Sequence, residues 1–261
     1  MAWWQQQDST KGSSIWPHVP ASLFYQNVAK NIRYAESLYQ GHSTNFCGYA
    51  AFSVLFIKDQ PERYARMILS LYQTGQYTDS SINITSSPEI RLAAGTWKGK
   101  GELQLNGADQ IWLLSLADHF KGYINTLNHK YNNGDENTDW CGTNLSKFRK
   151  MARQLGGYKT KAIGSDFYRP WVNEYDLYLA LAKGPVVLFV NSKYLYPNKF
   201  RIYNLRLPTH FILLYDIKLI DGYYAVTYWD YGLKTFQMFT ENRMRKLVYG
   251  VVEFPIKAEN P

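Results

Sequence analysis

Cysteine is scarce in this chain, and long hydrophobic runs are absent. Only Cys47 and Cys141 occur among 261 residues, too few to staple a scaffold with disulfides. Neither belongs to a CxxC pair or a paired-histidine spacing, so we expect no zinc site, no other metal and no cofactor. No apolar run approaches the ~20 residues that a membrane-spanning helix needs, and we expect no stable membrane insertion.

The first residues do not resemble a secretory signal. Residues 1–16 contain two tryptophans, but no basic region followed by an apolar one. We therefore expect synthesis in the cytoplasm, with any delivery out of the cell left to a specialised secretion system. Residues 1–20 are interpreted as a surface arm or docking segment.

Charge is unbalanced but not concentrated. Lysine and arginine number 29 against 21 acidic residues, for a net charge of +8. The densest basic segment, 147–153, is spaced like the solvated face of a helix. The many aromatic residues fall largely in expected strands, where cross-strand pairing is their usual role. We expect no nucleic-acid partner.

Hydrophobic periodicity predicts an α+β protein with helices first and strands later. Helices are expected near 22–39, 47–58, 60–74, 108–128, 143–155 and 174–182. Strands are expected at 158–163, 185–191, 209–219, 223–229 and 246–254. The pattern suits one domain over 21–261, with a helical part over about 21–135 and a sheet part over about 141–257. The polar segment 128–140 is the expected boundary, and the turn-rich stretch 78–107 is a β-excursion or a flap.

Cys47 lies between the polar loop GHSTN and the apolar run AAFSVLFI. This places a thiol at the start of a core helix, where unpaired N–H groups and the helix dipole favour thiolate over thiol. Thiolate is the species that attacks a carbonyl. Gly48 removes a side chain where a substrate backbone would approach.

His210 and Asp230 flank a predicted hairpin. The run FILLYDIKLI, the turn Asp221–Gly222 and the alternating YYAVTYW indicate two antiparallel strands. Counted from the turn, both residues fall near the open end of the hairpin. A carboxylate there can orient the imidazole, as the third member of a catalytic triad does.

Each of these residues also has a structural interpretation. A lone cysteine before an apolar run is often a core residue, and Asp in WDYG is a common turn former. Cys141 is a rival nucleophile, because it too precedes a glycine and a predicted helix, or a redox partner for Cys47. We favour Cys47, since its helix is the more core-like. The order Cys, His, Asp, each at the end of an element, indicates catalysis.

At these positions the chain resembles papain-like cysteine peptidases, nearest to the type that cleaves double-glycine leader peptides. CGYAAF (47–52) is similar to the start of the family's central helix, with Tyr49 where proline is common. The segment from Gly142 is similar to its second helix and following strand. KGPVVLFVN (183–191), THFILLYDI and YWDYG are similar to its first sheet strand, histidine strand and orienting strand end. The match covers about half the chain and leaves out 60–135.

The resemblance implies a papain-like fold, with the site in a cleft between a helical lobe and an antiparallel sheet lobe. It implies Cys47 as nucleophile, His210 as general base and acid, and Asp230 as orienting residue. The family adds a side-chain amide to the oxyanion hole. Gln40, seven residues before the cysteine, fits that role better by spacing than Asn45, two before it.

The implied activity is amide hydrolysis through a thioester, on a protein or peptide substrate. A peptidoglycan stem-peptide amidopeptidase, amide transfer to an amine and a non-catalytic binding module on the same fold are alternatives. The chain also resembles stand-alone papain-fold effector toxins of bacteria. That likeness implies an immunity-type inhibitor protein as partner.

Overall fold

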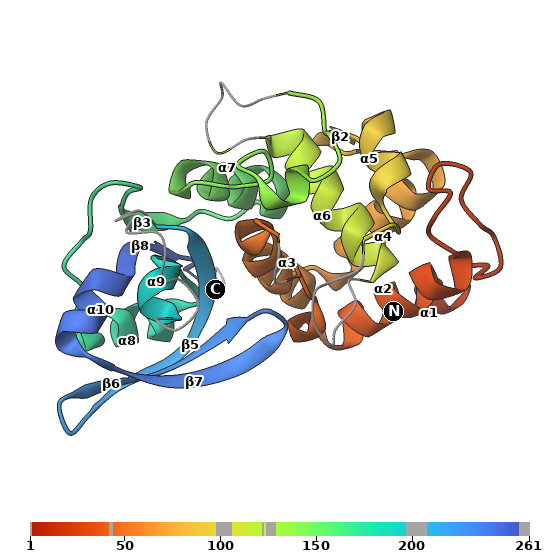
Figure 1. The fold of residues 1–261 in the computed structure, drawn as a ribbon. Coiled ribbons are helices and arrows are strands. Elements are labelled where there is room, and N and C mark those ends of the chain that lie inside the picture. Colours follow the sequence, from red (N-terminus) through yellow and green to blue (C-terminus); the bar gives the residue numbers. More distant parts are fainter. Residues whose placement is uncertain are drawn as a thin grey trace. The chain divides into compact units, whose positions relative to one another are not determined.

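Helices dominate residues Met1–Gly156 and a sheet dominates Gly157–Pro261, and these segments form two separate units of the computed structural model (Figure 1). The structure describes residues 2–41, 44–97, 106–121, 123, 129–196 and 208–255. The predicted α+β class is confirmed: a helical part is followed by a six-stranded antiparallel sheet. The division between the units falls after Gly156 rather than in the polar segment 128–140.

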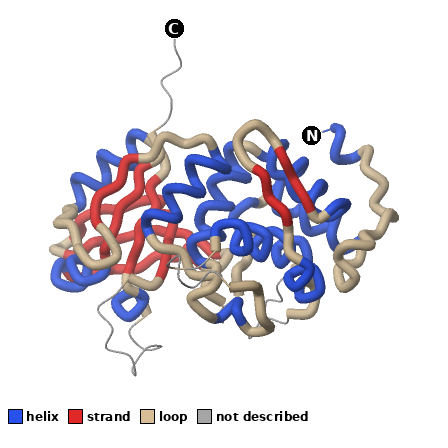
Figure 2. The backbone as a smooth tube through the Cα atoms, turned by 90° about the horizontal axis from the view of Figure 1, so that it is seen from above, coloured by secondary structure: helices blue, strands red, loops and turns tan. Residues whose placement is uncertain are grey.

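The first unit contains helices and one small hairpin. Its elements are α1 (Ala2–Gln5), α2 (Ala21–Arg33), η1 (Ala35–Ser37), α3 (Cys47–Asp59), α4 (Pro61–Thr74), β1 (Gln76–Thr78), β2 (Asn83–Thr85), α5 (Pro88–Ala93), α6 (Gly107–Phe120), η3 (Asp135–Asn137) and α7 (Leu145–Gly156). β1 and β2 pair antiparallel and are seen as an isolated red pair among the blue helices in Figure 2. The expected β-excursion therefore begins at Gln76, whereas residues 98–105 lie outside the described residues.

Two helices form the centre of this unit. α3 is buried from Cys47 to Ile57, and α6 is buried along nearly all its length. A helix that is apolar on every side must be surrounded by others, and the amphipathic helices α2, α4 and α7 supply that cover. The two central helices meet where Trp112 donates to the Ser53 hydroxyl at 2.7 Å and stacks against Phe56.

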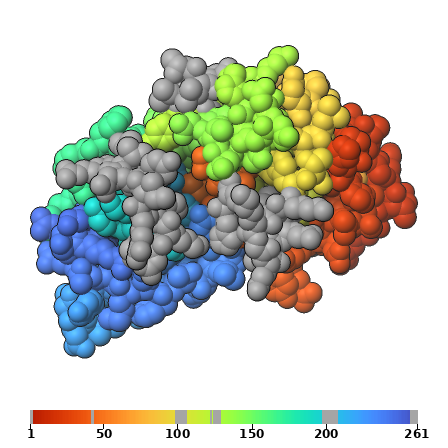
Figure 3. Space-filling view, in the orientation of Figure 1, coloured from red at the N-terminus to blue at the C-terminus, as the bar shows by residue number. Residues whose placement is uncertain are grey.

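The N-terminal segment packs on this unit. Trp16 is wholly buried, and its indole N–H donates to the Leu71 carbonyl at 2.7 Å. Arg66 lies over the ring of Trp3 at 4.6 Å. In Figure 3 these first residues, in red, spread beside the yellow segment of the same unit. Residues 2–20 thus contribute to the helical core as well as covering its surface.

The second unit is a sheet with helices between its strands. Its elements are β3 (Lys161–Gly164), α8 (Glu174–Lys183), β4 (Val186–Val190), α9 (Ser192–Leu195), β5 (His210–Ile220), β6 (Tyr223–Asp230), β7 (Leu233–Thr240), α10 (Glu241–Leu247) and β8 (Val248–Glu253). The strand order is β3-β8-β4-β5-β6-β7, and every neighbouring pair is antiparallel.

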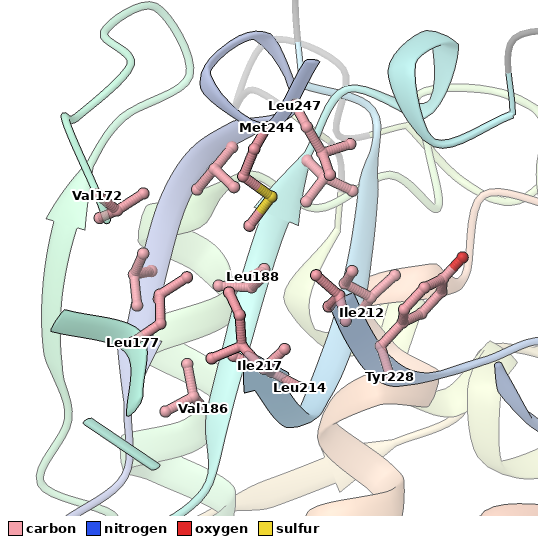
Figure 4. Packing of buried hydrophobic residues seen from close by; sticks show 14 of the residues in the cluster. Val172, Leu177, Val186, Leu188, Ile212, Leu214, Ile217, Tyr228, Met244 and Leu247 are labelled. Carbon is pink, nitrogen blue, oxygen red and sulfur yellow. The ribbon is translucent and has the colours of Figure 1, made fainter. Parts of the chain in front are cut away.

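One face of this sheet carries a continuous apolar cluster. Leu188, Ile212, Leu214 and Tyr228 project from the strands, and Met244 of α10 packs over them (Figure 4). Each fully buried side chain of this size stabilises the fold by about 1.5–3 kcal/mol. The cluster thus holds β4, β5 and β6 rigidly against the helices, and the open end of the β5–β6 hairpin belongs to this rigid part.

Candidate active site

Cys47 is the first residue of α3. The residue is 7% exposed, and the preceding Phe46 provides no side-chain cap for the first turn. The Ala50 N–H already bonds to the Phe46 carbonyl at 2.9 Å, whereas the N–H groups of the first turn have no partner inside the helix. A sulfur here lies beside backbone donors on a helix that packing holds in place.

Gln40 is wholly buried in the segment that leads to Cys47. Among the residues that the structure describes, none hydrogen-bonds to its Nε2 or its Oε1. An unsatisfied buried amide costs about 1–3 kcal/mol, so its retention calls for an explanation. The Thr44 hydroxyl donates to the Gln40 carbonyl, so the chain turns between these two residues. Thr44 lies three residues before Cys47.

Asn45, the alternative amide, is already engaged. Its side chain donates to the Thr138 carbonyl at 3.0 Å, and its backbone N–H donates to the Glu136 carbonyl at 2.8 Å. These bonds dock the loop around η3 against the segment before Cys47. Of the two amides that the sequence offered, that of Gln40 is the one with neither side-chain atom bonded to a described residue.

Cys141, the rival nucleophile, is wholly buried, and α7 begins only at Leu145. Its thiol donates to the Glu136 carbonyl at 2.9 Å, the same carbonyl that accepts from the Asn45 backbone. Burial raises the pKa of the Cys141 thiol well above its ordinary value, and the neighbouring Cys47 adds to that shift. A neutral, hydrogen-bonded thiol suits a structural role better than nucleophilic attack.

His210 and Asp230 meet in the second unit. The Nε2 atom of His210 lies 2.7 Å from Oδ1 of Asp230, and both side chains are almost completely buried. Because an ionised carboxylate only accepts, Nε2 carries the hydrogen, and Nδ1 is the nitrogen that can take up a proton. His210 begins β5 and Asp230 ends β6, so the two side chains come from opposite strands of one hairpin.

A β-bulge puts these two side chains on the same face of the sheet. Asp216 pairs with Thr227, but Leu214 pairs with Tyr228, so Tyr215 is one extra residue on β5. A one-residue shift exchanges the faces of a strand beyond the bulge. Without the bulge, His210 would share a face of the sheet with the odd-numbered residues of β6. The Asp230 side chain would then lie on the opposite face.

Two tyrosines that the sequence did not single out complete these surroundings. The hydroxyl of Tyr196, just after α9, donates to Oδ2 of Asp230. Burial, and then the Asp230 charge, raise the pKa of Tyr196, which keeps it a neutral donor. The ring of Tyr231 stacks on the imidazole, with 5.2 Å between centroids and 22° between planes. Their positions distinguish them little in the sequence: Tyr231 directly follows β6, and Tyr196 directly follows α9.

Some features are absent from the described parts of the chain. There, no group of three or more His, Cys, Asp or Glu side chains is placed to hold a metal ion. Over the same residues, no helix has both the length and the apolar character to cross a bilayer. Comparisons with protein-family models, with curated proteins and with solved structures found no match to this chain.

Proposed function

We propose that this chain is a papain-like cysteine peptidase, that is, a thiol hydrolase of amide bonds, with Cys47 as nucleophile, His210 as base and Asp230 as orienting residue. The observation that carries the proposal is the 2.7 Å contact between His210 Nε2 and Asp230 Oδ1 in a buried, rigid hairpin end. The Cys47 thiol, at the start of the core helix α3 in the first unit, also supports the proposal.

The orientation of the His210 ring suits a general base for a thiol nucleophile. Asp230 engages Nε2, so proton transfer falls to Nδ1. Tyr196 and the imidazole together satisfy both oxygens of Asp230, which fixes the ring plane and its tautomer. An aspartate held in this way stabilises the imidazolium that forms when the thiol loses its proton.

The reaction then proceeds in two halves. Nδ1 of His210 takes the Cys47 proton, and the thiolate attacks the amide carbonyl. The imidazolium gives that proton to the leaving amine as the C–N bond breaks, which leaves a thioester. Water, deprotonated by His210, attacks the thioester and releases the acid, and the thiol regains its proton.

The negative oxygen of each tetrahedral intermediate requires donors. We assign this role to the Cys47 backbone N–H and to Nε2 of Gln40. The buried, unpartnered amide of Gln40 supports the assignment. Removal of one such donor lowers kcat by about 100- to 1000-fold in well-studied hydrolases.

Site-mapped alkylation by iodoacetamide between pH 5 and pH 9 tests the thiol–imidazole pair. We expect rapid labelling of Cys47 near pH 6 in the native protein, slowed by roughly 100-fold in His210→Ala because the base is lost. Asp230→Asn should slow it less. His119→Ala, which removes an exposed imidazole from α6, is the matched control and should leave the rate unchanged.

Two outcomes would contradict the proposal. Labelling of Cys47 only after unfolding would indicate a structural thiol and a binding module rather than an enzyme. Preferential labelling of Cys141 would move the nucleophile to the loop before α7.

A further inference from the structure

The two edges of the six-stranded sheet differ in how they are protected. At one edge, β3 has only four residues, begins with the exposed Lys161 and ends at Gly164. At the other edge, β7 has eight residues, all paired with β6 in one unbroken register, and it contains no proline (Figure 1). Natural sheets protect their edges with short strands, charges, prolines or bulges, because an unprotected edge pairs with another chain. Lys234 is the only charged residue of β7, so this edge is open to pairing.

The pairing of β6 with β7 determines which backbone groups of β7 face outward. The turn between these strands has two residues, both with positive φ, and Asp230 pairs with Leu233 beside it. In such a hairpin the closing pair exchanges two hydrogen bonds, and every second pair after it does the same. The N–H and C=O groups of Lys234, Phe236 and Met238 therefore point away from β6. No described strand pairs with them.

The side chains along this edge are apolar and exposed. Leu233 is 60% exposed, Phe236 63% and Met238 41%. Backbone donors and acceptors at strand spacing are matched by another extended polypeptide, and the apolar side chains favour apolar residues at its alternating positions. The net charge of +8 opposes pairing with a second copy, whereas an acidic residue near Lys234 would be attracted.

We propose that β7 binds an extended, acidic polypeptide segment as a seventh strand of the sheet, and that this segment belongs to the substrate. β7 begins beside Asp230, and Tyr231 in the turn stacks on His210. An antiparallel partner, the slightly more stable arrangement, runs toward this end of β7. The paired segment therefore lies on the N-terminal side of the amide that reacts.

The spacing of strands sets how far from that amide the segment lies. The added strand would be three strand spacings, about 14 Å, from β5 and its His210, and an extended chain covers about 3.3 Å per residue. Roughly four or more residues must then separate the paired segment from the reacting bond. This step rests on the proposed function, whereas the pairing with β7 does not.

Selection from a bead-displayed library of random peptides about 12 residues long tests the pairing, with Cys47→Ala protein as bait so that no peptide is cleaved. We expect enriched peptides to carry apolar residues at every second position and at least one acidic residue. No enrichment, or apolar residues at helical spacing, would overturn the inference.

Two variants separate backbone pairing from side-chain contact. Met238→Pro removes an outward N–H but none of the hydrogen bonds to β6, and proline is tolerated at such edge positions. It should weaken binding of the most enriched peptide by roughly 10-fold, because a hydrogen bond is lost and the ring obstructs the added strand. Met238→Ala, the matched control, keeps the N–H and should weaken binding by roughly 3-fold or less. Equal losses in the two variants would contradict the pairing.

N-methylated peptides give the same test on unaltered β7, in case Met238→Pro does not fold. Methylation of the alternate amides that face β7 should weaken binding roughly 10-fold, and methylation of the other set should not. Equal effects of the two sets would overturn the pairing. A dimer seen by light scattering that Met238→Pro dissociates would instead identify a second copy as the occupant.

Cleavage separates the inference from the proposed function. Wild-type protein should cleave the enriched peptide when it is extended at its C-terminal end, and not when it is extended only at its N-terminal end. Cleavage of the N-terminal extension alone would overturn the assigned direction. Binding at β7 without cleavage of either peptide would refute the proposed function and leave the pairing in place.

Discussion

Tyr196 shows how a single side chain supports the His210–Asp230 pair. An orienting carboxylate is effective only if it cannot rotate, and its second oxygen needs a donor for that. Tyr196 supplies the donor from the chain just after α9, a short helix that follows a strand next to β5 in the sheet. We regard it as a positioning residue, because it acts on His210 through Asp230.

Tyr196→Phe should slow Cys47 alkylation at pH 6 by roughly 10-fold while the folded state persists, because Asp230 and the imidazole then gain freedom to rotate. Loss of one hydrogen bond to a charged group should also cost about 1.5–3 kcal/mol of unfolding free energy. The measurements are alkylation kinetics and urea unfolding. Tyr194→Phe, on α9 itself, is the matched control and should leave alkylation unchanged. Equal rates in the two variants would remove Tyr196 from the site.

The sequence indicated some of these residues and not others, for physical reasons. Cys47 was identifiable because a helix start and an apolar run are local patterns. The closeness of His210 and Asp230 followed from one hairpin. Tyr196 joins Asp230 from the chain after α9, and Asn31 of α2 joins Asp109 of α6 across 78 residues of sequence. Such long-range hydrogen bonds leave no periodic mark in a sequence.

At the scale of elements, the two ends of the β5–β6 hairpin differ in burial. The open end is buried and holds His210 and Asp230. The closed end is exposed and turns through Asp221 and Gly222, both with positive φ, at 49° and 79°. Glycine adopts this conformation without steric cost, and asparagine or aspartate tolerates it.

Gly222→Ala should destabilise the protein by about 1 kcal/mol, because a Cβ disfavours a positive φ. It should leave Cys47 alkylation unchanged, since His210 lies at the other end of β5. Thermal unfolding and alkylation kinetics check the two halves of this prediction. Gly12→Ala, where φ is not positive and no atom is near the added Cβ, is the control and should change neither. Slower alkylation in Gly222→Ala would mean that the turn controls the open end.

Strongly patterned elements were predicted more successfully than exposed ones. α3, α4, β4 and β5 lie within a residue or two of their expected bounds, because their buried side chains form clear apolar runs or periodic patterns. β7 and α10 were not predicted. In β7 only Phe239 is buried, so the apolar alternation that marks a half-buried strand is missing. The expected helix 22–39 ends at Arg33 and continues as η1, and the part of 108–128 beyond Phe120 lies mainly outside the described residues.

At the scale of the whole molecule, Asp109 couples stability to pH. Its pKa is raised from 3.8 to about 6 on folding, so between these values the folded chain binds more protons than the unfolded one. The free energy of unfolding contributed by this group is therefore fully present below pH 3.8 and is lost as the pH rises through 6. The size of the effect is roughly 3 kcal/mol.

Urea unfolding of the wild type and of Asp109→Asn at pH 4.5 and pH 7 tests this coupling. The stability of the wild type relative to the variant should decrease by roughly 2 kcal/mol between the two conditions. Other titrating groups affect both proteins equally and cancel in the difference. Parallel stabilities at the two pH values would show that the carboxylate is not buried in solution as it is here.

The extra residue Tyr215 makes the site sensitive to whether the hairpin has an odd or an even length. With a two-residue turn and regular pairing, two even-numbered positions on β5 and β6 never share a face, and the bulge is what allows His210 and Asp230 to do so. An insertion or deletion of one residue in either strand that shifts the pairing at the open end would put the two side chains on opposite faces. Two residues added together, one on each side of the turn, would lengthen the exposed end and leave the pair intact. Changes in the length of this hairpin should therefore be tolerated when each strand gains or loses one residue together.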